Sequence, residues 1–333
     1  MIKLDVLFIG GTGIISTACA REAIARGFDV TILNRGTSTL RPAPEGATLI
    51  RADVRDAASV RTAIGDRTFD VVVNFVNFAA EHVQLDIELF GGRLAQYVFI
   101  SSASAYQTPP THLPVTESTP LRNPFWEYSR AKIRCEDVLV AEYRQTGFPV
   151  TIVRPSHTYD PTMAPFDGGW TVVERMRQGR EVVVPGDGTS LWTITHHEDF
   201  ARGFVGLLGK QAAIGEAFHI TSHEALTWNQ IYTAVADAAG VVPRLVHVPS
   251  DAIAEADPEW GAAMLGDKSH SMVFDNSKLR SVVPGFAAHV PFAQGAREII
   301  AWHDADPARR IVDPVMDALF DKLVGAYRPR RAS

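Results

Sequence analysis

The segment that decides the fold is Leu4-Asp5-Val6-Leu7-Phe8-Ile9-Gly10-Gly11-Thr12-Gly13-Ile14-Ile15-Ser16, at residues 4–16. It joins an apolar run typical of a buried strand to a glycine-rich turn and then to a helical pattern. Glycines at such a turn let backbone N–H groups close around a pyrophosphate, and the helix N-terminus adds favourable charge. We interpret Gly10, Thr12, Gly13 and Ile14 as a dinucleotide-binding turn, with a plain tight turn as the alternative. Ser16 stands where a third glycine is typical, and its side chain is small enough to fit.

Outward from this turn, β-rich runs alternate with helical patterns through the first half of the chain. The expected strands are Leu4–Ile9, Val30–Leu33, Leu49–Ala52, Val71–Phe75, Val98–Ser101 and Val150–Val153. Helical spacing covers Ile14–Arg26 and Tyr128–Gln145. Near-continuous apolar strands that alternate with helices predict an α/β fold, a doubly wound parallel sheet of the Rossmann type.

Beyond about Tyr159 the alternation loosens into loops and shorter elements. Strands are expected at Val182–Val184, Ala217–Ile220 and Leu245–Val248, and helices at Asp199–Leu208, Trp228–Ala239 and Ala293–His303. We predict a dinucleotide-binding domain over residues 1–159 and a smaller C-terminal lobe, mainly for substrate, over residues 160–333. Because no clean linker separates them, the lobe is expected to be interleaved with the first domain.

The end of the second expected strand indicates which dinucleotide binds. An acidic residue there would hold the ribose hydroxyls of NAD, whereas an arginine accommodates the 2′-phosphate of NADP. The chain has Asn34 and Arg35 instead, so NADP is favoured over NAD, although Arg35 could also be a plain surface charge. Asp53 follows the third strand, where it could meet the adenine amino group, and Val54 and Asn74 are further candidates for cofactor binding.

A tyrosine and a lysine one helical turn apart predict an acid–base pair. Tyr128 and Lys132 are four residues apart, so they share one helix face. A phenol titrates at about pH 10, and a nearby ammonium favours the phenolate and lowers its pKa. Ser102 lies at the end of the fifth expected strand, and ligands of such sheets bind beyond the carboxyl ends of the strands. We expect Ser102, Tyr128 and Lys132 to form the catalytic set, with Tyr128 as the acid–base group.

Together these motifs resemble the extended short-chain dehydrogenase/reductase family, the NAD-dependent epimerases and dehydratases. The resemblance covers residues 4–303 and rests on Gly10-Gly11-Thr12-Gly13, Asp53, Ser102, Tyr128/Lys132, Arg154-Pro155-Ser156-His157-Thr158-Tyr159-Asp160-Pro161 and Val184-Pro185-Gly186-Asp187-Gly188. It implies that Pro155 borders the nicotinamide ribose, that Tyr128 and Lys132 also contact the cofactor, and that a hydride moves on a hydroxyl-bearing, sugar-like substrate. It also implies a homodimer joined by the Tyr128 helix and the helix before the fifth strand.

Two positions depart from the nucleotide-sugar members of that family. Those members have asparagine where this chain has His157, and an arginine for the substrate diphosphate where it has Trp192. Tryptophan offers no charge to a diphosphate but stacks well on a sugar or aromatic ring, although Trp192 could equally be lobe packing. Ser104, Tyr106, His157 and Trp192 are therefore the substrate-binding candidates. No metal site is expected, because the clustered histidines lack evident carboxylate partners.

Composition limits the other functional classes. The chain has 333 residues, 46% hydrophobic and 21% charged, with a net charge of −6 from 32 basic and 38 acidic residues. That balance does not favour nucleic acid as a partner, and no apolar run has the length of a membrane span. Two cysteines and no signal-peptide pattern favour a reducing, cytoplasmic compartment. Two non-catalytic alternatives stay open: RNA binding, because residues 192–200 also resemble RNA-binding plastid relatives of the family, and a cofactor-sensing regulator.

Overall fold

A seven-stranded parallel sheet forms the centre of the computed structural model, which describes residues 3–328. Its order is β11-β6-β5-β4-β1-β2-β3, and every neighbouring pair is parallel. The strands are β1 (Asp5–Ile9), β2 (Asp29–Asn34), β3 (Thr48–Arg51), β4 (Phe69–Asn74), β5 (Leu94–Ile100), β6 (Val150–Pro155) and β11 (Ala217–Ile220). The expected doubly wound parallel sheet is confirmed, with small shifts at the strand ends.

The strand order reverses between β1 and β4, which are neighbours in the sheet although β2 and β3 separate them in the chain. At such a switch point the loops after the two strands diverge and leave a crevice at the carboxyl edge of the sheet. The glycine turn follows β1 into this crevice. Ser102 and Pro155, at the ends of β5 and β6, lie along the same edge.

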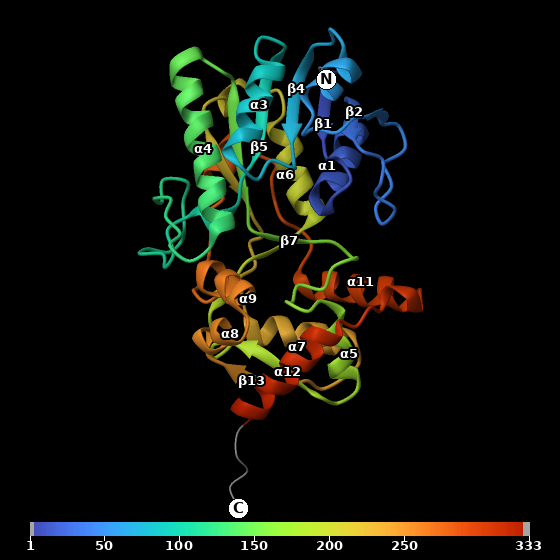
Figure 1. The fold of residues 1–333 in the computed structure, drawn as a ribbon, viewed down its shortest axis with the longest axis vertical. Helices are drawn as coiled ribbons and strands as arrows, with labels where there is room; N and C mark the ends of the chain where they lie inside the picture. Colours follow the sequence, from blue (N-terminus) through green and yellow to red (C-terminus); the bar gives the residue numbers. More distant parts are fainter. Residues whose placement is uncertain (1–2, 329–333) are drawn as a thin grey trace, which may run out of the picture.

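Helices cover both faces of the sheet (Figure 1). One face carries α1 (Ile14–Ala25) and α6 (His197–Leu207), whose core includes the rings of Phe8 and Phe204, 6.3 Å apart. The other face carries α2 (Ala57–Ile64), α3 (Ala80–Phe90) and α4 (Glu127–Thr146). The long helix α4 ends where Gly147 takes a left-handed φ of +79°, a conformation that glycine adopts without a Cβ clash.

Most of the chain after β6 forms a smaller lobe, drawn below the sheet in Figure 1. The exceptions are α6, β11 and α10 (Ser277–Val282), which return to the sheet, so the chain passes between the lobes several times. The other strands of the second half are β7 (His157–Tyr159), β8 (Glu181–Pro185), β9 (Leu191–Trp192), β10 (Ile194–His196), β12 (Leu226–Thr227) and β13 (Arg244–Val248). Its other helices are α5 (Trp170–Arg177), α7 (Trp228–Ala238), α8 (Ser250–Ala256), α9 (Pro258–Ala263), α11 (Phe292–Asp304) and α12 (Pro314–Tyr327).

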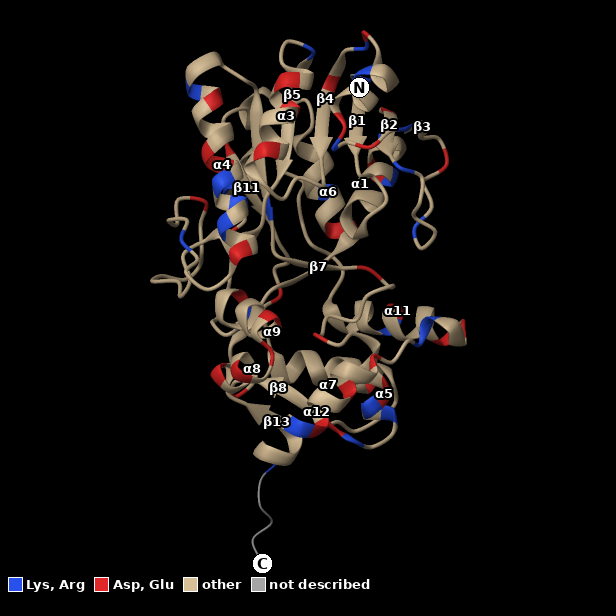
Figure 2. Cartoon of the chain, in the orientation of Figure 1, with Lys and Arg blue, Asp and Glu red and all other residues tan. Residues whose placement is uncertain are grey.

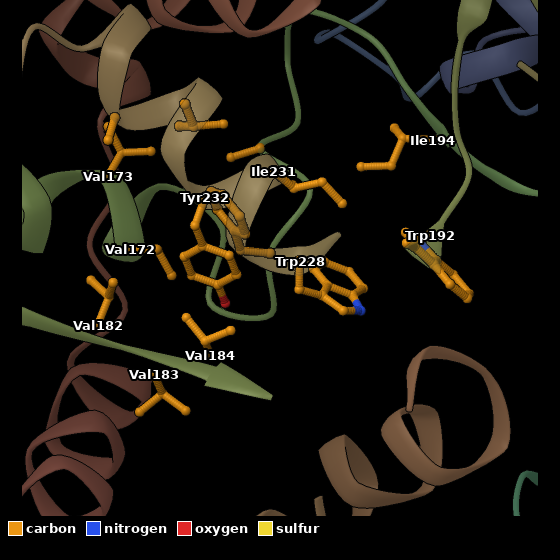
Figure 3. Packing of buried hydrophobic residues seen from close by; sticks show 14 of the residues in the cluster. Val172, Val173, Val182, Val183, Val184, Trp192, Ile194, Trp228, Ile231 and Tyr232 are labelled. Carbon is orange, nitrogen blue, oxygen red and sulfur yellow. The ribbon is translucent and has the colours of Figure 1, made fainter. Parts of the chain in front are cut away.

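Short helical turns complete the described chain. They are 3-10 turns at Ala103–Ala105, Gln211–Ala213 and Pro307–Arg309, and a π-helical turn at Met264–Lys268. Figure 3 shows the core of the smaller lobe, where Val182 and Val184 of β8 pack near Trp228 and Tyr232 of α7. Trp192 belongs to this core and also lines a pocket together with Ser102 and Tyr128.

Candidate active site

The turn after β1 has the geometry of an anion-binding site. Gly10 has φ +82°, and a Cβ there would lie 2.5 Å from Cγ1 of Val76, so glycine is required. Gly13 is the N-cap of α1, and the first N–H groups of a helix are the ones that bind anions. The Ser16 hydroxyl accepts from the Gly13 N–H at 2.7 Å and donates to the Gly10 carbonyl at 2.9 Å. Serine in place of a third glycine therefore closes the turn instead of disturbing it.

A pocket of about 500 Å³ opens beside this turn, and we call it the dinucleotide pocket. Its lining residues are Ile9, Gly10, Thr12, Gly13, Leu33, Asn34, Arg35, Gly36, Thr37, Ser38, Ala52, Asp53, Val54, Arg55, Val76 and Phe78. This lining contains the predicted cofactor-binding residues apart from Tyr128, Lys132 and three others. Ile14 begins α1 directly beyond the turn, Pro155 lines the neighbouring pocket, and Asn74 lies elsewhere. The glycine cradle and the size of the pocket fit a dinucleotide.

The end of β2 presents cations and no carboxylate. Asn34 turns its side chain onto its own loop, where Oδ1 accepts from the Gly36 N–H at 2.8 Å. Arg35 lines the pocket and is exposed, with no hydrogen-bond or ion-pair partner within residues 3–328. A Cβ on Gly36 would lie 3.1 Å from Nε of Arg51, so a second guanidinium stands beside this loop. Sequence patterns alone do not indicate Arg51, because it points toward the loop only through the pairing of β3 with β2.

Ser102 and Ser104 form a hydroxyl chain at the end of β5. Ser102 caps the 3-10 turn that follows, with its Oγ accepting from the Ser104 N–H at 3.2 Å. The two hydroxyl oxygens lie 2.8 Å apart, and Ser104 Oγ accepts from Ser129 Oγ at 2.7 Å. Ser102 and Tyr128 line the same pocket, and Ser102 acts to lower the pKa of the Tyr128 phenol. The predicted serine and tyrosine are therefore brought together, and Ser104 orients Ser102 as well as lining the pocket.

Lys132, predicted to act with Tyr128, reaches the edge of the sheet. Nζ of Lys132 donates to the carbonyls of Asn77 at 2.6 Å and Ile100 at 2.8 Å, and it lies 5.8 Å from the centroid of the Tyr128 ring. Burial lowers the pKa of Lys132 to about 8. Burial also raises the pKa of Tyr128 to about 12, although the nearby Ser102 opposes the rise. The pKa of Tyr128 therefore lies above its usual value, whereas the sequence led us to expect a lowering by Lys132.

A second pocket, of about 260 Å³, contains the phenol, and we call it the catalytic pocket. Its lining residues are Ser102, Ala103, Ser104, Trp126, Tyr128, Pro155, Ser156, His157, Trp192, Thr193, Asp267, Lys268 and Phe274. Within the described chain, Nε2 of His157 and Nε1 of Trp192 are buried there without a hydrogen-bond partner. An unpaired buried polar group costs roughly 1–3 kcal/mol, so a polar ligand in the pocket would relieve both. Burial lowers the pKa of His157 to about 3, which keeps this ring neutral.

The position of Trp192 is compatible with both interpretations given above, packing in the smaller lobe and lining the substrate pocket. Its ring stacks on Trp228 at 5.8 Å between centroids and 22° between planes, and both rings are visible in Figure 3. Trp228 Nε1 donates to the Lys268 carbonyl at 3.1 Å, which ties this stack to the wall of the catalytic pocket. Trp192 is thus part of the lobe core on one side and of the pocket on the other.

Tyr106 does not reach the catalytic pocket, although it was expected to bind substrate. Its side chain is fully buried, and its hydroxyl lies 3.1 Å from Nδ1 of His219. The Arg154 guanidinium lies 4.9 Å from the centroid of its ring. Tyr106 follows the 3-10 turn and bridges to Leu121, so the chain has already turned inward at this position. The structure gives Tyr106 a packing role.

Asn74 likewise lies outside the dinucleotide pocket. It is fully buried, and its Nδ2 donates to Oδ2 of Asp86 at 2.7 Å. Its Oδ1 accepts from the Val76 N–H at 2.8 Å. Asn74 therefore holds Val76, which lines the pocket, without lining it itself. The physical reason is that the strand register turns this side chain toward α3.

Two charged residues of the catalytic pocket have no signal in the sequence. The π-helical turn Met264–Lys268 brings Asp267 and Lys268 to the pocket wall. Burial raises the pKa of Asp267 to about 7, with Lys268 opposing the rise and Asp167 adding to it. Nζ of Lys268 lies 3.8 Å from Oδ2 of Asp167. A glycine followed by two charged residues is equally typical of a surface loop, and only the packing of the lobe against α4 makes it part of a site.

Residues 6–221 match the NAD dependent epimerase/dehydratase family. The chain belongs to this family. It is 27% identical over 255 residues to the chloroplast stem-loop binding protein of 41 kDa b of Arabidopsis thaliana, covering 73% of this chain and 65% of that protein, less than two thirds of its length. It is 25% identical over 335 residues to dTDP-glucose 4,6-dehydratase of Streptomyces niveus, covering 90% of this chain and 93% of that protein. The solved structure of epimerase Mth375 from Methanothermobacter thermautotrophicus shares the fold, with a TM-score of 0.75 at 17% identity, covering 92% of this chain and 94% of that chain.

Membership of this NAD dependent epimerase/dehydratase family confirms the family that the sequence motifs indicated, and NAD is the cofactor class of that family. The matched range includes the glycine turn, the Ser102, Tyr128 and Lys132 set, and Trp192. No helix within residues 3–328 is long and apolar enough to cross a membrane. In that same range, no group of three or more His, Cys, Asp or Glu is placed to hold a metal ion; His196 instead meets Glu298, 3.0 Å away.

Proposed function

We propose that this enzyme transfers a hydride between a nicotinamide dinucleotide and a hydroxyl-bearing carbon of a small, sugar-like substrate, with Tyr128 as the acid–base group. The observation that carries the proposal is the adjacency of the two pockets. Ser102, Tyr128 and Pro155 line the catalytic pocket, and Phe78 of the dinucleotide pocket lies 6.4 Å from Tyr128, ring to ring. A bound dinucleotide would supply the hydride donor or acceptor.

Tyr128 is in the protonation state that a general acid needs. Burial holds it as the neutral phenol, with a pKa of about 12, and a neutral phenol can protonate the oxygen of a carbonyl substrate. The Ser102 hydroxyl lines the same pocket as the phenol and would hold that same oxygen. In the oxidative direction the phenol would first release its proton to solvent, and the phenolate would then accept the substrate's hydroxyl proton as the hydride leaves for the cofactor; a nearby positive charge favours that phenolate. Lys132 supplies such a charge only while it is protonated, and its pKa of about 8 makes that charge sensitive to pH near neutrality.

The charges around the catalytic pocket favour an uncharged substrate over a nucleoside diphosphate sugar. Lys268 is the cation among its lining residues, and Asp267 lies beside it in the same wall. The adjoining hollow shares Lys268 and is lined by Asp167, Asp257 and Glu259. A diphosphate that extended from the pocket in this direction would meet like charges, which repel it. The pocket volume and its unpaired polar atoms support a free sugar or polyol instead.

Three finer features belong to the same proposal. Arg35 and the absence of an acid at Asn34 support NADP(H) over NAD(H) as the cofactor. The packing of α3 beside α4 on one face of the sheet supports a homodimer joined through these helices. Two buried, unpaired cysteines support a reducing cytoplasmic location.

The test is a screen of free sugars and polyols, with UDP-glucose and dTDP-glucose included, in the presence of NAD(P)⁺ or NAD(P)H. Formation or loss of reduced nicotinamide reports dehydrogenase turnover, and chromatography of the sugars reports epimers or dehydration products. Tyr128→Phe should lose turnover, whereas Tyr143→Phe, an exposed tyrosine on the same helix, should keep it. Efficient turnover of a nucleotide sugar would overturn the substrate proposal, and full activity of Tyr128→Phe would overturn the mechanism.

RNA binding is the second candidate, because the Arabidopsis relative is named a stem-loop binding protein. The charge distribution argues against it: in Figure 2 the basic and acidic residues are interspersed over both lobes, and the net charge is −6. A nucleic-acid surface needs a basic patch or stripe. A mobility-shift assay with a stem-loop RNA, at low and at physiological salt, distinguishes the two functions. Salt-resistant binding together with no turnover of any sugar would favour the RNA-binding function.

A further inference from the structure

A buried hydrogen-bond network lies behind the active site and centres on Asp86 of α3. Asp86 is 1% exposed, and its Oδ2 accepts from the Tyr97 hydroxyl at 2.5 Å, from Asn77 Nδ2 at 2.6 Å and from Asn74 Nδ2 at 2.7 Å. Within residues 3–328 no cation contacts this carboxylate directly. Burial raises the pKa of Asp86 to about 6. An acid at this place is costly for folding, which points to a function that a neutral side chain would serve less well.

Asn77 connects this carboxylate to both pockets. Its backbone carbonyl accepts from Nζ of Lys132 at 2.6 Å, and its Oδ1 accepts from Nη1 of Arg55 at 3.2 Å. Arg55 lines the dinucleotide pocket and also donates to the carbonyl of Val76, another residue of that pocket. The side-chain amide of Asn77 therefore donates through Nδ2 to Asp86 and accepts through Oδ1 from Arg55. The backbone carbonyl of the same residue accepts from Lys132. One residue carries all three connections.

We propose that Asp86 is a positioning residue for Lys132, acting through Asn77. The carboxylate fixes the side chain of Asn77, and with it the orientation of the peptide carbonyl that holds the lysine ammonium. It also keeps Oδ1 of Asn77 turned toward Arg55, so the wall of the dinucleotide pocket and the catalytic lysine share one anchor. The proposal rests on the role of Lys132 at the cofactor and not on the identity of the sugar.

Other groups also act on Lys132 and must be separated from Asp86. They are Tyr128, Cys135 and Glu136 on α4, Arg55 after β3 and His82 on α3. Of these groups, Arg55 is the one that hydrogen-bonds Asn77 within residues 3–328, and its bond to Oδ1 depends on the same amide orientation. Changes confined to Asp86 leave the others in place, so a change in the behaviour of Lys132 would report the path through Asn77.

Two substitutions separate charge from hydrogen bonding. Asp86→Asn keeps an oxygen that can accept the three hydrogen bonds and removes the charge, whereas Asp86→Ala removes both. The readout is the affinity for NADPH and NADH from about pH 6 to about pH 10, measured by nicotinamide fluorescence. In the wild type we expect the affinity to fall as pH rises through the pKa of Lys132, about 8. The midpoint should move down by about half a pH unit in Asp86→Asn and by about one unit in Asp86→Ala, roughly threefold and tenfold in proton affinity.

Gln96→Met is the matched control. Gln96 is also 1% exposed, and its Nε2 donates to Thr151 Oγ1 at 2.9 Å while its Oε1 accepts from the Gly209 N–H at 2.7 Å. That network faces α6 and does not include Asn77, so Gln96→Met should lower stability without moving the midpoint. Unchanged midpoints in both Asp86 variants, an equal shift in Gln96→Met, or a flat wild-type profile would each overturn the proposal. If Asp86→Ala does not fold, Asp86→Asn is judged by the same criterion. Because binding needs no sugar, this test stays distinct from the substrate screen.

Discussion

Removal of the Arg35 guanidinium tests the choice of cofactor most directly. Arg35 lines the dinucleotide pocket and is exposed. A hydrogen bond to a charged group contributes about 1.5–3 kcal/mol, or about ten- to a hundredfold in Kd. The lower end applies here, because solvent screens an exposed charge and because Arg51 stays beside Gly36 as a second cation. We expect Arg35→Ala to weaken NADPH binding by about tenfold and NADH binding by less than about twofold.

Calorimetry with both dinucleotides measures this difference, at low salt and at about 0.1 M salt, where the Debye length is about 10 Å. The NADPH advantage should shrink with salt, since it depends on exposed charge. Arg61→Ala removes an exposed arginine of α2 that lies outside the pocket and should change neither affinity. Asn34→Asp should reverse the preference, because it restores an acid for the ribose hydroxyls. NADH binding as tight as NADPH binding in the wild type, unaffected by Arg35→Ala, would refute the reasoning.

Four further outcomes are expected. Tyr128→Phe should lower turnover by about a hundred- to ten-thousandfold with unchanged dinucleotide affinity, whereas Lys132→Ala should impair both, as steady-state kinetics and fluorescence titration will show. Burial raises the pKa of Asp267 to about 7 from its usual 3.8. The folded protein therefore loses stability as the pH rises between those two values, because the carboxyl group must ionise while buried. Asp267→Asn should raise the melting temperature at about pH 8 but not below about pH 4. Trp192→Arg should not create turnover of UDP-glucose if the pocket is shaped for a free sugar, and such activity would contradict that shape. Light scattering at micromolar concentration should give the mass of a dimer, and a monomer would count against pairing through α3 and α4.

Local chemistry made the sheet and the glycine turn predictable. The buried strands of the sheet are near-continuous apolar runs, and the turn after β1 needs the positive φ of Gly10, so each feature lies within a few consecutive residues. The spacing of Tyr128 and Lys132 is also local, because one helical turn fixes it. Ser102 could be placed because parallel strands end at a common edge. These inferences need no knowledge of which segments meet in space.

Tertiary packing alone decided the rest of the site. Asp267 lines the catalytic pocket because a π-helical turn meets α4 there, and Asp86 reaches Asn77 because α3 packs behind β4 and β5. The same packing buries Tyr106 in the core, away from the catalytic pocket. It also raises the pKa of Tyr128, because the cause of that shift is burial, which the spacing of Tyr128 and Lys132 does not reveal. A sequence pattern indicates which side chains share a helix face or a strand end. Burial and contacts between the lobes depend instead on residues that are distant in the sequence and meet only in the folded chain.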